Sequence, residues 1–250
     1  MEVAVRRRDA KFFGFHACRA VAARRPEAVQ RAYVTEATLP AFADLLQDLA
    51  RRRRPYRVVA AAELAKVAGS KHHEGVCLVA DPPPAPEPGA LFAELARRPA
   101  ARLLYLDGVS NPHNVGALLR TAAHFRVGAL LGPAEALPSA AGGTARVAEG
   151  GAERVPIVRF RHPARSLERL AAAGFCRVAT VVAEGEPAWA AELPAHCVLL
   201  LGAERAGLRQ TTRALADRVV TIPGSGAVES LNVGAAAAVL LAEHARRHGT

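Results

Sequence analysis

Apolar runs of strand length alternate with amphipathic segments throughout residues 101–250, and this alternation limits the fold more than any other feature. LLYLDG precedes NVGALLRTAAHF, and HCVLLLGAE and RVVTIP follow further along the chain. Continuous apolar strands separated by amphipathic helices indicate a parallel sheet that is covered by helices on both faces. The sequence therefore predicts an α/β domain over residues 101–250.

Three segments of this region place polar or glycine residues at the ends of apolar runs. In open α/β sheets, ligands bind outside the carboxyl ends of the strands. The glycines do not match the commonest nucleotide folds, because GSGAVES lacks the third glycine of a dinucleotide fingerprint and no GxxxxGK[ST] occurs. The three segments are NPHNVGALLRTA (111–122), LLLGAERAGL (199–208) and IPGSGAVESLNVGAAAA (222–238).

In type, order and spacing these segments resemble the three signature motifs of the SpoU (TrmH-like) family of RNA ribose 2'-O-methyltransferases. The resemblance implies a SPOUT-type, trefoil-knotted parallel sheet with helices on both faces. It also implies that S-adenosylmethionine is the methyl donor. Periodicity cannot indicate a knot, and knots are rare among folds, so the expected knot depends on the resemblance alone.

The resemblance also identifies candidate catalytic residues. Asn114 and Arg120 fall in the first motif, Glu204 in the second, and Ser230 and Asn232 in the third. The family mechanism makes Arg120 the activator of the 2'-hydroxyl. A guanidinium rarely loses its proton, so phosphate binding and stabilisation of the developing alkoxide is the physically simpler role. We expect Glu204 to orient Arg120 or to bind RNA, whereas residues 230 and 232 could equally cap the last helix.

For the cofactor, the resemblance points to backbone contacts near Gly202, Ile222 and Leu231, with Thr180 as a weaker candidate. Main-chain groups can hold the adenine edge while apolar side chains enclose its ring. The last helix is apolar around much of its circumference, so it is buried against the sheet or against another subunit. Because SpoU domains are homodimers, we expect a homodimer.

A proline-rich segment divides the chain. Residues 81–90, DPPPAPEPGA, contain five prolines and predict a semi-rigid extended connection. We therefore assign residues 1–80 to a first domain, 81–100 to a linker and 101–250 to the catalytic domain. Helix and strand patterns alternate in residues 10–80 and indicate a small α/β sandwich. This part resembles the SpoU substrate-binding domain, which is similar to ribosomal RNA-binding proteins.

The charge favours a polyanionic partner. Lysine and arginine number 33 against 23 acidic residues, which gives a net charge of +10, and almost all of the basic residues are arginine. A GC-rich genome explains the preference for arginine but not the excess of positive charge. Arg51, Arg52, Arg53 and Arg54 follow a predicted helix, where they could contact RNA phosphates or simply suit the helix dipole.

Neither the histidines nor the cysteines suggest a metal site. His72 and His73 are adjacent and lack a third ligand nearby, so we favour a turn or an RNA-facing loop. No CxxC pair occurs, and the scattered cysteines are expected to be free thiols in a reducing compartment: Cys18, Cys77, Cys176 and Cys197.

The sequence contains no evident targeting signal. The start, MEVAVRRRDAK, has no apolar signal region, and no run of 18 apolar residues is free of charges. We therefore expect a cytoplasmic protein with no membrane span.

The resemblance is closest to a YfiF-type subgroup, in which segments like FFGFHACRA, HHEGVC, ESNPHN and AEGGAE recur. Two functions remain open. The first is methylation of rRNA or tRNA at a ribose 2'-hydroxyl, which the complete set of five motif residues favours. The second is a catalytically silent RNA-binding protein of the same fold that acts in RNA folding or ribosome assembly. Binding of S-adenosylmethionine distinguishes them.

Overall fold

The computed structural model describes residues 9–249, which form two compact units. The first unit combines the chain up to Pro84 with residues 139–154, and the second holds Ala85–Pro138 together with the chain from Val155 onward. The chain therefore passes from the first unit to the second between Pro84 and Ala85, within the linker expected at residues 81–100. The assignment of all of 101–250 to one domain differs from the structure, because residues 139–154 pack with the first unit.

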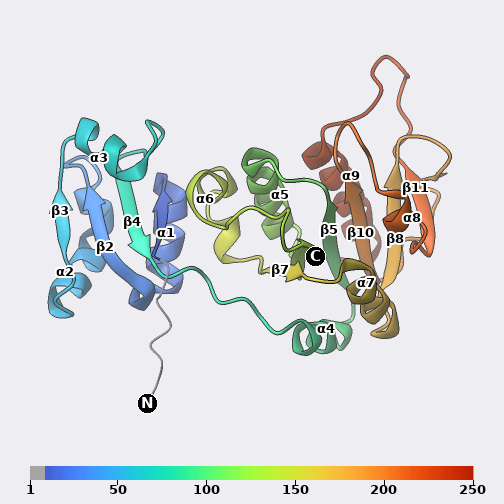
Figure 1. The fold of residues 1–250 in the computed structure, drawn as a ribbon, viewed down its shortest axis with the longest axis horizontal. Coiled ribbons are helices and arrows are strands. Elements are labelled where there is room, and N and C mark those ends of the chain that lie inside the picture. Colours follow the sequence, from blue (N-terminus) through green and yellow to red (C-terminus); the bar gives the residue numbers. More distant parts are fainter. Residues whose placement is uncertain (1–8, 250) are drawn as a thin grey trace. The chain divides into compact units, whose positions relative to one another are not determined.

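The first unit is the predicted small α/β sandwich. Its sheet has the strand order β1-β4-β2-β3, in which β2 and β3 are parallel and the other neighbours antiparallel (Figure 1). One face packs Phe12, Val21 and Leu49 together, and the other packs Phe13 and Leu64. The elements are β1 (Ala10–Phe13), α1 (Phe15–Arg24), η1 (Pro26–Ala28), β2 (Val29–Val34), η2 (Leu39–Phe42), α2 (Ala43–Arg51), β3 (Tyr56–Val58), α3 (Ala61–Ala68) and β4 (Val76–Ala80).

A segment from the middle of the chain completes this unit. Helix α6 (Gly142–Ala148) contacts β1 and α1, and the short η3 (Gly151–Glu153) contacts α1. Arg25, at the end of α1, binds Glu153 through two hydrogen bonds of 2.6 and 2.8 Å. Because Arg25 is only 8% exposed, this is a largely buried ion pair.

Three of the four segments that carry the subgroup resemblance meet in this unit. Glu74 of HHEGVC accepts a hydrogen bond from the backbone N–H of Phe15 at 2.8 Å and so caps the start of α1. Gly14 of FFGFHACRA has φ 95°, and a Cβ there would lie 2.7 Å from Cγ of Arg146. Glu153 of AEGGAE supplies the partner of Arg25. Each segment therefore fixes the packing of another.

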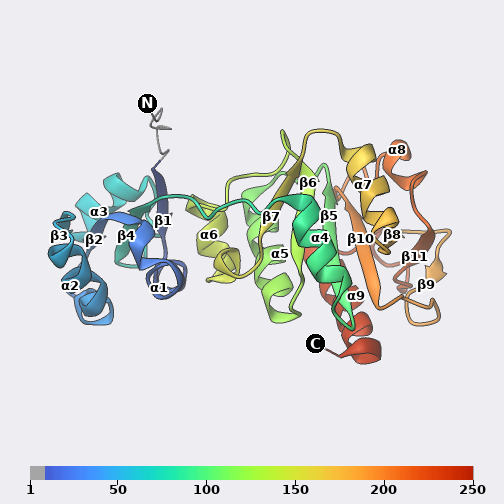
Figure 2. The same ribbon diagram turned by 90° about the horizontal axis from the view of Figure 1, so that it is seen from below.

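The second unit contains one seven-stranded sheet of parallel strands in the order β7-β6-β5-β10-β8-β11-β9, as Figure 2 shows. This confirms the parallel sheet that the apolar runs predict. Its elements are α4 (Pro88–Ala96), β5 (Ala101–Asp107), α5 (Pro112–His124), β6 (Ala129–Pro133), β7 (Ile157–Phe160), α7 (Pro163–Ala172), β8 (Cys176–Val181), β9 (Glu186–Pro187), β10 (His196–Gly202), α8 (Gln210–Arg213), β11 (Arg218–Thr221) and α9 (Val233–His248).

Helices cover both faces of this sheet. Leu103 and Tyr105 of β5 share a core with Phe92 of α4 and Leu167 of α7. Leu104 lies between them in the strand, so its side chain points to the opposite face; it is also fully buried but lies outside that core. Helices α5 and α9 pack against each other, and α9 contacts β10. The sheet thus has α4 and α7 on one face and α5 and α9 on the other.

The proline-rich segment is extended only as far as Glu87. The carboxylate of Glu87 accepts hydrogen bonds from the backbone N–H groups of Gly89 and Ala90, and Pro88 occupies the first turn of α4. Proline suits that position, because its missing N–H would be unpaired there anyway. The expected extended linker therefore ends earlier than residue 100, where a helix replaces it.

Candidate active site

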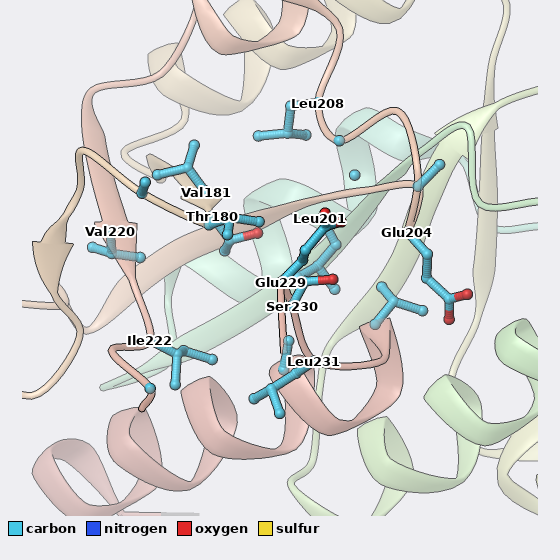
Figure 3. Close-up of a pocket in the computed structure, with 18 of the residues that line it drawn as sticks. Thr180, Val181, Leu201, Glu204, Leu208, Val220, Ile222, Glu229, Ser230 and Leu231 are labelled. Carbon is cyan, nitrogen blue, oxygen red and sulfur yellow. The ribbon is translucent and has the colours of Figure 1, made fainter. Parts of the chain in front are cut away.

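An open cavity of about 940 Å³ lies at the carboxyl ends of β8, β10 and β11 (Figure 3). All four residues predicted to bind the cofactor line it: Thr180, Gly202, Ile222 and Leu231. Its wall is formed by the chain after β10, the chain after β11 and the start of α9. The apolar strands end there, as expected for a ligand crevice in a parallel sheet.

Gly202 allows two parts of this wall to approach each other closely. A Cβ at residue 202 would lie 2.1 Å from the backbone carbon of Gly207. The N–H of Gly207 donates to the carbonyl of Ala203 at 2.7 Å, which closes the chain after β10 into a tight turn. Only glycine fits at the end of this strand.

A buried carboxylate holds the far end of the same turn. Asp107, the last residue of β5, has a fully buried side chain and accepts hydrogen bonds from the backbone N–H and the Nε of Arg209 at 2.9 and 2.6 Å. The carbonyl of Asp107 also accepts the N–H of Ala203. Sequence reasoning missed both partners, although an acid that ends an apolar strand is a signal for such a role.

Glu204 connects the second motif to the other two. Its Oε1 accepts a hydrogen bond from the side-chain amide of Asn114 at 3.0 Å and from that of Asn232 at 2.5 Å. The side-chain oxygen of Asn232 in turn accepts the N–H of Gly234 and caps α9. One carboxylate therefore ties α5, the turn after β10 and the start of α9 together. In Figure 3 the Glu204 side chain points toward α5.

The predicted residues divide into two sets. Ser230 and Glu204 line the cavity, whereas Asn114 and Asn232 reach it only through Glu204. Arg120 is exposed on α5 and does not belong to the cavity lining. Thr180 lines the cavity, but its hydroxyl donates to the carbonyl of Leu200 at 2.9 Å and is therefore already paired.

The cavity lining carries charges that the motifs did not single out. Glu184 and Glu229 contribute carboxylates, and Arg205 and Arg213 contribute guanidinium groups. Arg213 lies 3.8 Å from Glu184 as an exposed ion pair. A molecule bound here would meet apolar side chains deep in the cavity and charged groups at its edge.

The four consecutive arginines of the first unit have different surroundings. Arg52 donates to the carbonyls of Pro26 and Glu27 and pairs with Asp48 at 2.8 Å, so it holds η1 and α2 together. Arg51 has a 71% exposed side chain, and Arg53 and Arg54 are also exposed. Three of the four are thus available to a partner, and Arg52 has a structural role.

His72 and His73 lie in a loop, as expected. The imidazole Nδ1 of His73 accepts the backbone N–H of Gly75 at 3.0 Å, and its carbonyl accepts the N–H of Gly14. His73 is 8% exposed, so its role is to hold the turn before β4.

The cysteines are free thiols, as predicted. Burial raises the pKa of the Cys77 thiol to about 11 and that of Cys197 to about 12. Such thiols stay protonated near neutral pH and react slowly.

Within residues 9–249, the longest apolar stretches in helices fall short of what a bilayer span requires. The predicted absence of a signal region concerns Met1 to Arg8, which lie outside the described residues.

Comparison with known proteins finds two family matches along the chain. Residues 101–242 match the SpoU rRNA Methylase family, and residues 12–86 match the family described as RNA 2'-O ribose methyltransferase substrate binding. The chain is 36% identical over 246 residues to the tRNA/rRNA methyltransferase YfiF of Escherichia coli O157:H7, covering 97% of this chain and 70% of that protein. It is 35% identical over 242 residues to the 23S rRNA (guanosine-2'-O-)-methyltransferase RlmB of Pseudomonas putida, covering 95% and 96%.

Solved structures give the same result. An RNA 2'-O ribose methyltransferase superposes with a TM-score of 0.78 at 25% identity, over 96% of this chain and 89% of the other. The SpoU methyltransferase AviRb of Streptomyces viridochromogenes, solved in complex with AdoMet, superposes with a TM-score of 0.76 at 23% identity, over 96% and 90%. The predicted SPOUT-type α/β fold is confirmed, and the knot stays a prediction.

Proposed function

The chain belongs to the SpoU family of RNA ribose 2'-O-methyltransferases, and we propose that its methyl donor, S-adenosylmethionine, occupies the cavity at the ends of β8, β10 and β11. The observation that supports this most directly is the lining itself, in which Gly202, Ile222, Leu231 and Thr180 surround one space. The enzyme transfers the methyl group to a ribose 2'-hydroxyl of RNA.

The residues present fit this donor. Val181, Leu201 and Ile222 offer apolar surface to an adenine ring, and the turn closed by Gly202 brings backbone groups to its edge. The carboxylates of Glu184 and Glu229 suit a ligand that carries positive charge. When bound, S-adenosylmethionine supplies an electrophilic methyl group.

The protein's own groups then have to position the RNA and stabilise charge. Glu204 fixes the side-chain amides of Asn114 and Asn232, and so holds α5 at a set distance from the cavity. Arg120, on the same helix, carries a permanent positive charge. We assign to it the stabilisation of the alkoxide that develops as the hydroxyl reacts. To Ser230, which lines the cavity, we assign the orientation of the ribose.

The substrate is rRNA or tRNA. RlmB is named for 23S rRNA and YfiF for tRNA or rRNA, and both resemble the full length of this chain. The net charge of +10 and the exposed Arg51, Arg53 and Arg54 support RNA binding by the first unit. A catalytically silent RNA-binding protein would not need a cavity built in this way.

We propose a homodimer that uses the outer face of α9. Ala235, Val239 and Ala242 of α9 recur at helical spacing and are exposed, and Leu231, just before the helix, continues this stripe; Leu231 is 45% and Val239 40% exposed. An apolar stripe of this kind suits an interface between identical helices. Within one chain α5 packs against α9. A dimer formed across α9 would therefore bring Arg120 of one subunit toward the cavity of the other subunit. The cytoplasm, where RNA is methylated, is the proposed location.

Calorimetric titration with S-adenosylmethionine tests the proposal, with Leu231→Asp as the variant and Leu39→Asp, an exposed residue of the first unit that does not line the cavity, as the control. We expect saturable binding to the wild type and the control, and none to Leu231→Asp. Transfer of a radiolabelled methyl group to bulk rRNA and tRNA then identifies the substrate. Absence of any heat signal in the wild type, with or without RNA, would contradict the proposal.

A further inference from the structure

Strand β3 lies at the edge of the first unit's sheet, and all three of its residues are exposed. Tyr56 and Val58 are each 43% exposed, an unusual degree for aromatic and β-branched side chains within a strand. The two side chains lie on the same face of the strand, because side chains two residues apart point the same way. The edge thus presents an aromatic ring beside an aliphatic side chain.

This edge is surrounded by positive charge. Arg53 and Arg54 come directly before Pro55 and are exposed, and within residues 9–249 neither has an ion-pair partner. Arg53 has φ 54°, and the N–H of Arg54 donates to the carbonyl of Leu49 at 2.8 Å, so the turn is well defined. The nearby acids are already engaged, since Asp48 binds Arg52 and Glu63 binds Arg57.

We propose that Tyr56 is a stacking platform for an unpaired base of the substrate RNA, with Arg53 and Arg54 binding the adjoining phosphates. Proteins that bind single-stranded RNA combine exposed aromatic rings, on which bases stack, with arginines that follow the backbone. A paired base is already stacked within its helix, so the RNA that contacts β3 is a loop, a bulge or a single strand.

A protein strand is a poorer occupant of this edge. Strand β3 has three residues, follows Pro55, which has no N–H, and is flanked by like charges. These features discourage pairing with another strand. The positive charge complements RNA instead.

The inference concerns the RNA bound by the proposed methyltransferase, but its test does not depend on turnover. We would measure binding of a short single-stranded RNA and of a blunt duplex of the same length to the full chain. Tyr56→Leu should weaken binding of the single strand about tenfold and leave duplex binding unchanged. Tyr56→Phe, which keeps the ring, should bind both RNAs like the wild type.

Charge variants separate stacking from phosphate contact. Arg54→Ala should weaken the binding of both RNAs and lower the slope of log affinity against log salt by about 1. Arg19→Ala, an exposed arginine in the middle of α1, the helix that contacts β1 and β4, is the control and should leave the binding of both RNAs and the salt slope unchanged.

Several results would overturn the proposal: equal single-strand binding by Tyr56→Leu and the wild type, an equal loss with both RNAs, or an altered oligomeric state in Tyr56→Leu with RNA affinity unchanged. Loss of single-strand affinity in Tyr56→Phe would also overturn it. Failure of the methyltransferase assignment would be seen separately. The protein would then not bind S-adenosylmethionine, whereas the RNA affinities of the wild type and the variants would follow the pattern given above.

Discussion

The Oε1 atom of Glu204 accepts a hydrogen bond from the side-chain amide of Asn114 at 3.0 Å, although the two residues lie 90 positions apart. The same oxygen accepts the amide of Asn232, which caps α9. One carboxylate therefore joins all three motifs, and its loss would leave two amides without their common acceptor.

Glu204→Ala should lower methyl transfer by about tenfold or more, because α5 and the start of α9 lose their shared anchor. The residue is exposed, so the free energy of unfolding should change by less than about 1 kcal/mol. Steady-state kinetics and urea unfolding measure the two effects. Glu168→Ala, an exposed acid on α7, is the control. A fully active Glu204→Ala enzyme would remove the carboxylate from the mechanism.

Arg120→Ala should strongly reduce methyl transfer while the fold and cofactor binding remain. If Arg120 stabilises charge that appears only during reaction, its loss lowers turnover about a hundredfold, or roughly 2.7 kcal/mol. Arg120→Lys should recover only part of the rate, because an ammonium cannot form the bidentate contact of a guanidinium. His124→Ala, exposed one turn further along α5, serves as control. Near wild-type turnover of Arg120→Ala would direct attention to Glu204 as proton acceptor.

Gly202→Ala should disrupt the cavity. The added Cβ would lie 2.1 Å from a backbone carbon, so the turn must shift, at a cost of about 1–3 kcal/mol in the free energy of unfolding. Cofactor affinity should fall with it. Gly224→Ala is a matched control in the same cavity, since nothing lies within 4 Å of its added Cβ. Thermal unfolding and calorimetry compare the two, and similar results for both variants would contradict the role of Gly202.

Arg25→Ala should destabilise the first unit by about 3 kcal/mol or more, because it leaves the Glu153 carboxylate, whose side chain is 4% exposed, without its partner. Arg98→Ala breaks the exposed pair of Arg98 with Glu94 and should cost less than about 0.5 kcal/mol. Limited proteolysis should cut residues 139–154 faster in Arg25→Ala alone. Removing both partners, in Arg25→Met with Glu153→Leu, should restore part of the stability.

Acid should weaken the second unit through His244. Burial, followed by the positive charge of Arg102, lowers the pKa of this fully buried imidazole to about 4. The unfolded chain, with a pKa near 6.5, binds the proton more readily, so the contribution to stability is complete above about pH 6.5 and is lost as the pH falls toward 4. Between pH 7 and pH 5 this amounts to about 2 kcal/mol. Urea unfolding of His244→Leu should show a smaller loss over that range, and an equal loss would refute the assignment.

Local patterns predicted those elements whose signal lies within one segment. The apolar runs of β5, β10 and β11 and the long apolar face of α9 required no tertiary information. Strand β1 has only four residues, and α6 begins with two glycines, so neither carries a clear periodicity. The packing of α6 on β1 could not be predicted, because no local pattern records which unit a helix joins.

The candidate site divides in the same way. The motifs predicted the cavity residues, since each lies at the end of an apolar run. The contact of Asp107 with Arg209 and that of Glu204 with Asn114 span 102 and 90 positions, and a single sequence contains no sign of such pairs. Arg52 was grouped with its neighbours because its bonds to the carbonyls of η1 depend on how α2 packs.

The ion pair of Arg25 with Glu153 affects the order in which the protein can fold during synthesis. Arg25 leaves the ribosome while 128 positions of chain still separate it from its partner, and those positions include β5, α5 and β6. The first unit therefore cannot be completed when its own sheet has been made. It must wait until strands of the second unit have emerged, so the N-terminal half of a nascent chain stays unfinished longer than its sequence position suggests.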